Sequence, residues 1–134
     1  MATALLFLGA SLPLCAQADD AQEIRHLIAR RYDKPGKTVQ TEPVVIVGGH
    51  AVADWVQGTR GGRALLAKSN GQWTLRLCSG AGLKTVDGLA GTGVPKPAAV
   101  ALAKKLEEAE AGLPHALRAR FDLFGEPSGP GMAN

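Results

Sequence analysis

The fold is decided by residues 43–78, which read PVVIVGGHAVADWVQGTRGGRALLAKSNGQWTLRLC. Short glycine-containing turns separate four apolar segments in this stretch. Gly48-Gly49 and Asn70-Gly71 are two-residue turns of the kind that hairpins favour, because their residues tolerate positive φ angles. A longer turn at residues 58–62 separates the two middle segments. We therefore predict an antiparallel meander of four strands, Pro43–Val47, His50–Gln57, Arg63–Lys68 and Gln72–Cys78.

The alternation of side chains along these strands predicts two unlike faces. With residues 58–61 as the middle turn, Trp55 would lie opposite Ala64, and the Asn70-Gly71 turn would place Leu77 opposite Ala64 on the next strand. One face then becomes an apolar core face, made of Val44, Ile46, Ala53, Trp55, Leu66, Trp73, Leu75 and Leu77. The other face mixes polar and apolar residues, namely His50, Asp54, Arg63, Thr74, Arg76 and Cys78 with Val45, Val47, Val52 and Leu65. We expect further elements to cover part of this half-apolar face.

Helices are predicted before and after the meander. Residues 21–32 carry apolar side chains at helical spacing, and Pro35-Gly36 ends that helix. A short helix is predicted over residues 83–90. A longer one follows Pro95 and Pro97, with an apolar stripe of Ala98, Leu102, Leu106, Ala109 and Leu113, and a last helical turn or two starts at Pro114. The resulting α+β fold has an N-terminal helix, a four-stranded antiparallel meander and C-terminal helices, cystatin-like or NTF2-like in outline.

The amino terminus is typical of a secretory signal peptide. An apolar run, Ala4–Leu14, precedes an Ala-x-Ala site at residues 16–18. The run is shorter than the ~20 apolar residues that span a bilayer. We predict cleavage after Ala18, a periplasmic product and no integral membrane segment after processing. Lipidation of Cys15 is disfavoured, because Leu14 stands where a lipobox has a small residue.

The processed chain is predicted to be one α+β domain at residues 19–125 with a Pro/Gly-rich, disordered tail at residues 126–134. The formal net charge is +3, and the 15 Lys and Arg are scattered among 12 Asp and Glu. This pattern lacks the basic stripe with interleaved aromatic residues that nucleic-acid binding needs, so no nucleic-acid partner is expected.

Two patterns would indicate an enzyme, but in each the required residues do not lie at the positions that the chemistry needs. Residues 80–85 look like a phosphate loop, but Leu83 and Cys78 stand where that motif has glycines. A nucleophilic Cys78 would need a nearby histidine, and the meander places His50 roughly 20 Å from it. On the mixed face, Asp54 could pair with Arg63 or Arg76, and we expect a structural ion pair there rather than an active site. The chain is therefore not expected to be an enzyme.

Cys78 is the residue best suited to bind a metal. Copper(I) prefers thiolate, thioether and imidazole ligands. Arg63 and Arg76 on the same face would favour the thiolate form of Cys78. Met132 and three histidines supply further donor atoms, but none at a ligand spacing. Two copies that met along the half-apolar face would bring two Cys78 thiolates together, so a homodimer is one expected route to weak copper binding. No other cofactor is expected.

Residues 50–80 also resemble a known family. They contain a Trp-x-Gln-Gly turn, a Gly-Gly-Arg-Ala-Leu-Leu strand and a Gly-x-Trp segment that ends in Leu-Cys-Ser-Gly. These motifs resemble the bacterial family called copper uptake system-associated protein. Elsewhere Glu-Pro-Val-Val-Ile-Val, Gly-Val-Pro and Phe-Asp-x-Phe look similar too, so the resemblance covers most of the chain. It implies work beside an outer-membrane copper receptor and periplasmic copper carriers, without implying catalytic residues.

The first hypothesis is therefore a non-enzymatic periplasmic accessory of copper uptake that acts through protein contact or weak, transient copper contact. Its partners would be copper-uptake components of the cell envelope. The alternative is a small-molecule-binding NTF2-like or cystatin-like domain unrelated to copper, with a pocket between the sheet and the helices. A third hypothesis is an inhibitor or envelope-stress module of cystatin-like shape.

Overall fold

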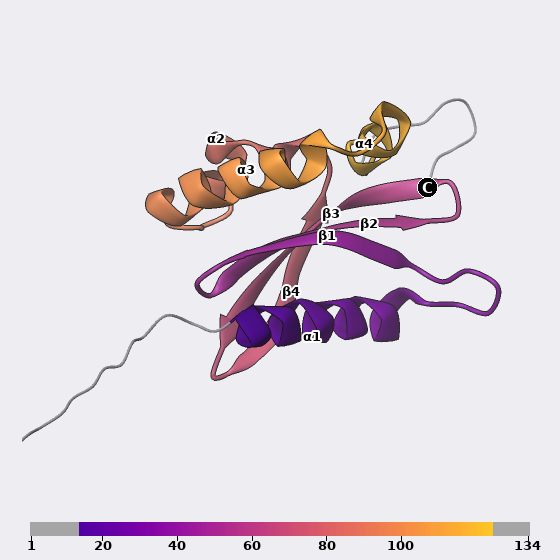
Figure 1. Cartoon of the computed structure of the whole chain (residues 1–134), viewed down its shortest axis with the longest axis horizontal. Coiled ribbons are helices and arrows are strands. Elements are labelled where there is room, and N and C mark those ends of the chain that lie inside the picture. The colour runs from indigo at the N-terminus through magenta and orange to yellow at the C-terminus, as the bar shows by residue number, and fades with distance from the viewer. Residues whose placement is uncertain (1–13, 125–134) are drawn as a thin grey trace, which may run out of the picture.

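The computed structural model describes residues 14–124 and contains the predicted elements in the predicted order (Figure 1). The predicted tail at residues 126–134 lies outside the described residues, as does the predicted signal peptide apart from Leu14–Ala18, the first residues of the N-terminal helix. The elements are α1 (Leu14–Tyr32), β1 (Gln40–Val47), β2 (His50–Gln57), β3 (Arg60–Ser69), β4 (Gln72–Ser79), the 3-10 helix η1 (Ala81–Lys84), α2 (Val86–Gly91), α3 (Lys96–Ala111) and α4 (His115–Phe121).

The elements form three layers, with the sheet in the middle (Figure 1). The four strands are antiparallel and lie in the order β1-β2-β3-β4, as a meander requires. Helix α1 lies on one face of the sheet, while α2, α3 and α4 lie on the other. In the part of the chain that the structure describes, every helix is too short or too polar to cross a membrane.

Tight turns set the register of the meander. Val47 pairs with His50 around Gly48-Gly49, and Ser69 pairs with Gln72 around Asn70-Gly71, which confirms both predicted hairpins. Asn70 and Gly71 have φ angles of 54° and 77°, the left-handed values that such a turn needs.

The middle turn is tighter than predicted, because Gln57 pairs with Arg60. Strand β3 therefore starts three residues before the predicted Arg63. Trp55 lies opposite Gly62 instead of Ala64, and Ala53 takes the place opposite Ala64. This slip of two residues leaves every side chain of β2 and β3 on its predicted face, since side chains alternate with a period of two.

A β-bulge at Arg76 makes two predictions wrong. Leu66 pairs with Leu75 and Leu65 with Leu77, so Arg76 is an extra residue without a partner on β3. An extra residue reverses the faces of all residues after it. Leu77 consequently leaves the predicted core face and is 36% exposed, whereas Cys78 joins the face covered by α1.

Each face of the sheet buries its own apolar cluster. The α1 face packs Ile24 and Ile28 against Ala53, Leu66 and Trp73. Seven of the eight residues predicted for this face lie in or against the cluster, Leu77 being the exception. The opposite face packs Val45, Val52 and Leu65 against Leu89, Leu102 and Leu106 from α2 and α3, which confirms that the half-apolar face is covered.

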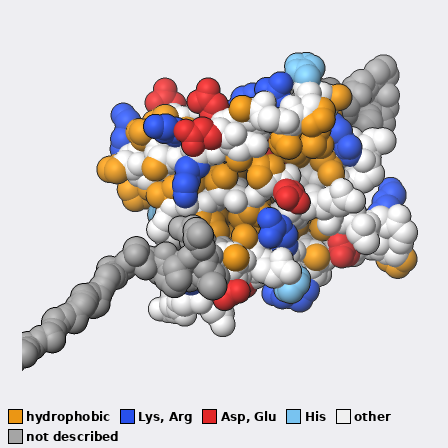
Figure 2. Space-filling model, in the orientation of Figure 1, with side chains coloured by type: hydrophobic (Ala, Val, Ile, Leu, Met, Phe, Trp, Pro, Cys, Tyr) orange, Lys and Arg blue, Asp and Glu red, His pale blue; other side chains and the backbone are white. Residues whose placement is uncertain are grey.

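The molecular surface carries charges of both signs. In the view of Figure 2, Lys and Arg side chains alternate with Asp and Glu, and apolar side chains fill much of the space between them. No single-signed stripe crosses this face.

Candidate functional site

The most concentrated group of charges in the described chain surrounds Arg63 on β3. The Arg63 side chain is fully buried. Its Nε and Nη2 donate hydrogen bonds to Oε2 and Oε1 of Glu110 on α3, at 2.9 and 2.8 Å. This two-pronged contact is the strongest geometry an arginine and a carboxylate can form. It ties the middle of the sheet to the last turn of α3.

The third nitrogen of the guanidinium binds the C-terminal end of α4. Arg63 Nη1 donates to Oδ1 of Asp122 at 2.6 Å and to the carbonyl oxygen of Gly80 at 3.2 Å. The guanidinium also lies 5.7 Å from the centre of the Phe121 ring, within cation–π range. One side chain thus joins β3, the β4–η1 turn, α3 and α4.

Asp54 on β2 completes the group. Its Oδ1 lies 3.5 Å from Arg63 Nε, and the side chain is fully buried. Within the described residues no donor makes a hydrogen bond to either oxygen of Asp54. Burial and the neighbouring Glu110 carboxylate raise the pKa of Asp54 to about 9, against the opposing charge of Arg63. Asp54 therefore keeps its proton at neutral pH, beside the Glu110 carboxylate.

The two remaining carboxylates are ionised. Burial alone would raise the pKa of Glu110, but the hydrogen bonds and the charge of Arg63 hold that pKa below its usual range. The pKa of Asp122 is likewise lowered, because hydrogen bonds from Arg63 and Lys84 outweigh burial. Lys84 Nζ reaches Asp122 Oδ2 at 3.2 Å. Two cations, Arg63 and Lys84, therefore balance two carboxylates, and a protonated Asp54 leaves the group neutral.

Glycines allow the backbone to close around this group. A Cβ atom on Gly80 would lie 2.5 Å from the carbonyl oxygen of Asp122, and one on Gly61 would lie 2.6 Å from that of Arg120. Any larger residue would push the end of α4 away from the sheet. The last residues of α4 reach Arg63 only because both positions lack side chains.

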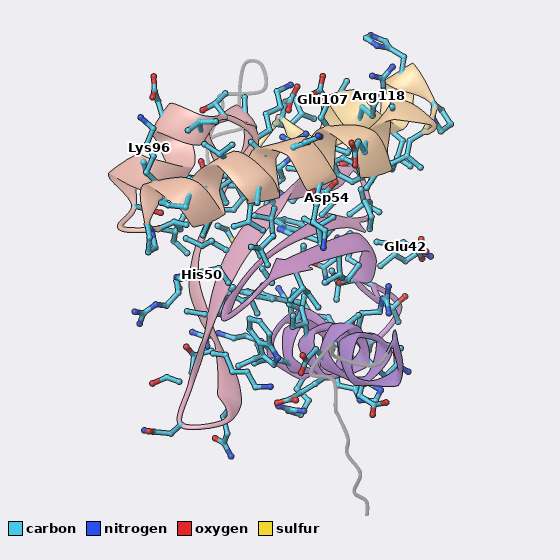
Figure 3. The ribbon with its side chains drawn as sticks, turned by 60° about the vertical axis from the view of Figure 1, so that its left-hand side comes forward. Glu42, His50, Asp54, Lys96, Glu107 and Arg118 are labelled. Carbon is cyan, nitrogen blue, oxygen red and sulfur yellow. The ribbon has the colours of Figure 1, made fainter. Side chains whose placement is uncertain are left out.

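The arrangement is chemically a closed ionic staple. Arg63 and Asp54 are shielded from solvent, and Figure 3 shows Asp54 between the sheet and the helical layer. These two side chains have no access to a substrate, whereas Asp122 and Lys84 lie partly exposed at the rim of the group. They hold elements together, and Asp54 lies beside Arg63, as the sequence predicted.

Sequence reasoning placed only part of this site. Arg76 lies at the exposed bulge, away from Asp54, so the alternative Asp54–Arg76 pair is wrong. Glu110 and Asp122 were missed. Glu110 stands four residues after Leu106 and so falls on the buried stripe of α3, which is a usable signal for a buried partner of Arg63. Asp122 lies inside the Phe-Asp-x-Phe motif.

Cys78 lies apart from this group, on the α1 face of the sheet. The thiol is half-buried and free. Burial raises the pKa of Cys78, against the opposing effects of Trp55, Tyr32 and Arg31. The expectation that Arg63 and Arg76 activate the thiolate is therefore wrong, because the bulge places Cys78 on the opposite face from Arg63. A dimer formed along the covered half-apolar face would not bring two Cys78 thiols together.

Metal donors do not converge in residues 14–124. No three His, Cys, Asp or Glu side chains there are placed to hold an ion together. His26 and His115 are exposed, and Met132 lies outside the described residues. Among the described residues, Cys78 thus stays the best candidate for copper on chemical grounds.

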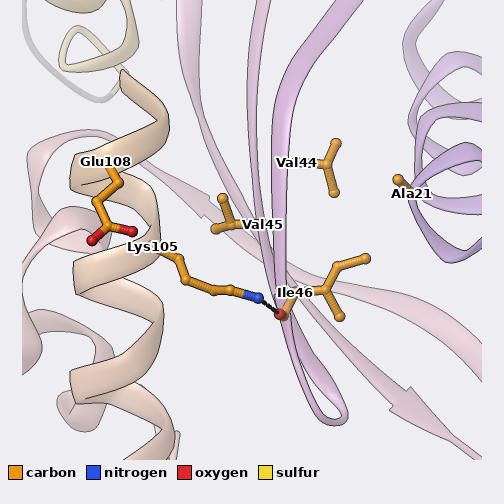
Figure 4. A pocket seen from close by; sticks show the side chains of 6 residues that line it. All are labelled: Ala21, Val44, Val45, Ile46, Lys105 and Glu108. Atoms are coloured by element: carbon orange, nitrogen blue, oxygen red, sulfur yellow. Dashed lines mark hydrogen bonds between the residues drawn. The ribbon is translucent and has the colours of Figure 1, made fainter. Parts of the chain in front are cut away.

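A small pocket of about 270 Å³ lies at the free edge of β1, between α1 and α3 (Figure 4). Within it, Lys105 Nζ donates to the carbonyl oxygen of Ile46 at 2.9 Å. On the α1 side, Arg25 Nε donates to the carbonyl oxygen of Thr41 at 3.0 Å. Cations from both helices thus cap outward-facing carbonyls of an edge strand, which protects that edge from pairing with another chain.

Comparisons of the chain with protein-family models, with curated proteins and with solved structures find no match.

Proposed function

We propose that the chain is a non-enzymatic periplasmic accessory of bacterial copper uptake, which acts through protein contact or weak, transient copper contact. One observation carries the proposal: the motifs that resemble the copper uptake system-associated proteins meet around Arg63. Motifs that are far apart in the sequence but contact one another in the structure would together hold the fold of such a family.

The convergence involves motifs from both ends of the domain. The Gly-Gly-Arg motif supplies Gly61, Gly62 and Arg63, and the Cys-Ser-Gly motif supplies Gly80, whose carbonyl accepts from Arg63. The Phe-Asp-x-Phe motif supplies Phe121, which lies under the guanidinium, and Asp122, which pairs with it.

The Trp-x-Gln-Gly turn is held on one side by Phe124 of the Phe-Asp-x-Phe motif and on the other by the end of α1 and the segment that follows it. The rings of Trp55 and Phe124 meet edge to face, with centroids 6.0 Å apart. Gln57 Nε2 donates to the carbonyl oxygens of Tyr32 and Lys37, at 2.7 and 3.0 Å. The resemblance therefore extends to residues whose contacts define this fold, which supports membership in a family with the same scaffold.

The chemistry of the described residues favours contact over catalysis. The side chains with the most perturbed pKa values are sealed inside the ionic staple, where perturbation reflects a structural network. Burial raises the pKa of Cys78, which disfavours the thiolate that binds copper(I), and no three metal donors converge within residues 14–124. Tight copper carriage is therefore not part of the proposal.

A deletion strain of the source bacterium tests this function. Grown at limiting copper, the strain should contain less copper per cell than its parent, with zinc per cell unchanged. The full chain should restore the copper content. A chain that begins at Asp19 and lacks the predicted signal peptide should not, because it would stay in the cytoplasm. Unchanged copper in the deletion strain, or rescue by the leaderless chain, would refute the proposal.

A further inference from the structure

The outer side of the helical layer contains a groove of about 710 Å³, which borders the ionic staple at Lys84 and Glu110. Its walls come from the η1–α2 segment, from α3 and from α4. Its volume lies within the range of roughly 300–1,000 Å³ that is usual for small-molecule sites. The sheet contributes no lining residue, so this is not the pocket between sheet and helices that the sequence-based alternative expected.

The lining is partly apolar and partly charged. Val86, Val100, Ala103 and Leu106 form the apolar part. Val100 is 48% exposed, which is high for a valine on a packed helix. A ligand with a hydrocarbon portion would cover this surface and remove it from water.

The charges of the lining leave an excess of positive charge. Lys84 is paired with Asp122, and Glu110 is paired with Arg63, so both are already neutralised. Lys104 and Arg118 remain, opposed by Glu107 alone, and none of these three forms an ion pair within residues 14–124. Figure 3 shows Glu107 and Arg118 near each other on the outer side of the helical layer.

Arg118 has a donor that lacks an acceptor. Its Nε is buried, and no atom of the described residues accepts its hydrogen. A buried donor left without a partner is unfavourable, and an arginine fork matches a carboxylate in geometry. A carboxylate bound in the groove would pair with the Arg118 guanidinium and neutralise the local charge.

We propose that this groove binds a small amphipathic carboxylate, whose carboxylate pairs with Arg118 and whose hydrocarbon portion lies on Val86, Val100 and Ala103. Lys104 on the facing side adds a second, weaker attraction for the anion. This inference is independent of the role in copper uptake.

Octanoate is a suitable probe, and octan-1-ol is its uncharged counterpart. In an NMR titration of the processed protein, octanoate should shift the amide signals around Lys84–Val86, α3 and Arg118, with one saturable site. Octan-1-ol should bind at least tenfold more weakly. Arg118→Gln should weaken octanoate binding about tenfold, the usual effect of losing one charge-assisted contact. Lys104→Gln, at an exposed position, should weaken it about two- to threefold.

Arg30→Gln is the matched control, because Arg30 is exposed on α1 in the opposite layer. It should leave the affinity unchanged, and the dispersion of the amide spectrum establishes that each variant is folded. Equal binding of octanoate and octan-1-ol would overturn the proposal. So would shifts centred on another surface, or a folded Arg118→Gln variant with unchanged affinity. A folded Lys104→Gln variant that alone lost binding would overturn the assignment of Arg118 as the anchor.

Discussion

Arg63 and Glu110, which are 47 positions apart in the sequence, are joined by two buried hydrogen bonds of 2.9 and 2.8 Å. This contact holds the helical layer on the sheet. Arg63→Met keeps much of the side-chain volume but leaves Glu110 and Asp122 without their main partner. Removing one member of a buried ion pair costs about 3–5 kcal/mol, so we expect a loss of that size in the free energy of unfolding.

Arg76→Met is the control for that variant, because Arg76 is exposed at the bulge. It should change the free energy of unfolding by less than about 0.5 kcal/mol. Urea denaturation of both variants gives the comparison. Similar losses in the two would mean that Arg63 does not hold the layers together.

Local patterns predicted the meander well because turns and alternation are properties of neighbouring residues. Gly48-Gly49 and Asn70-Gly71 fix their hairpins without help from the rest of the chain. The bulge at Arg76 could not be predicted in this way. Nothing in the segment from Gln72 to Cys78 marks an extra residue, and one such residue reversed the faces of both Leu77 and Cys78.

The candidate site was harder to predict than the sheet because its partners are distant in sequence. Asp54 and Arg63 lie on neighbouring strands of one hairpin, so pleat alternation alone brings them together. Glu110 and Asp122 reach Arg63 only after α3 and α4 have packed on the sheet. Their placement depends on close approach at Gly61 and Gly80, which no local pattern reveals.

Asp54 makes stability depend on pH in an unusual direction. Its folded-state pKa of about 9 lies above the ordinary value of 3.8, so between those pH values the folded state holds a proton that the unfolded state has lost. The contribution of Asp54 to the free energy of unfolding is complete below about pH 4. It declines as the pH rises toward 9, by at most about 1.4 kcal/mol per pH unit. Glu110 and Asp122, whose pKa values are lowered, act oppositely and lose their contribution only in acid.

Asp54→Asn isolates this effect, since asparagine cannot ionise. The free energy of unfolding of the variant relative to that of the wild type should increase steadily from pH 5 to pH 9. Urea denaturation at several pH values measures the difference. A difference that is constant over this range would show that Asp54 is already ionised in the folded protein.

Gly80 should tolerate no side chain. In Gly80→Ala the new methyl group would meet the backbone of Asp122, with 2.5 Å to its carbonyl oxygen. We expect a loss of about 1–3 kcal/mol in the free energy of unfolding, typical of overpacking. Gly91→Ala is the control, because a Cβ at Gly91 meets nothing within 4 Å and Gly91 ends a helix. Gly91→Ala should be neutral or slightly stabilising in thermal denaturation. A Gly80→Ala variant with the same unfolding temperature as Gly91→Ala would contradict the close packing of α4.

The central claim is that the chain does not bind copper(I) tightly. A copper(I) competition with the purified protein that starts at Asp19 tests it most directly. A chromophoric copper(I) chelator is titrated against the wild type and against Cys78→Ser. We predict that the chelator keeps nearly all the copper at equimolar protein, because no three metal donors converge within residues 14–124 and burial raises the pKa of the Cys78 thiol. Any small share that the wild type takes should disappear in Cys78→Ser. Tight one-to-one binding that persists in Cys78→Ser would contradict this account.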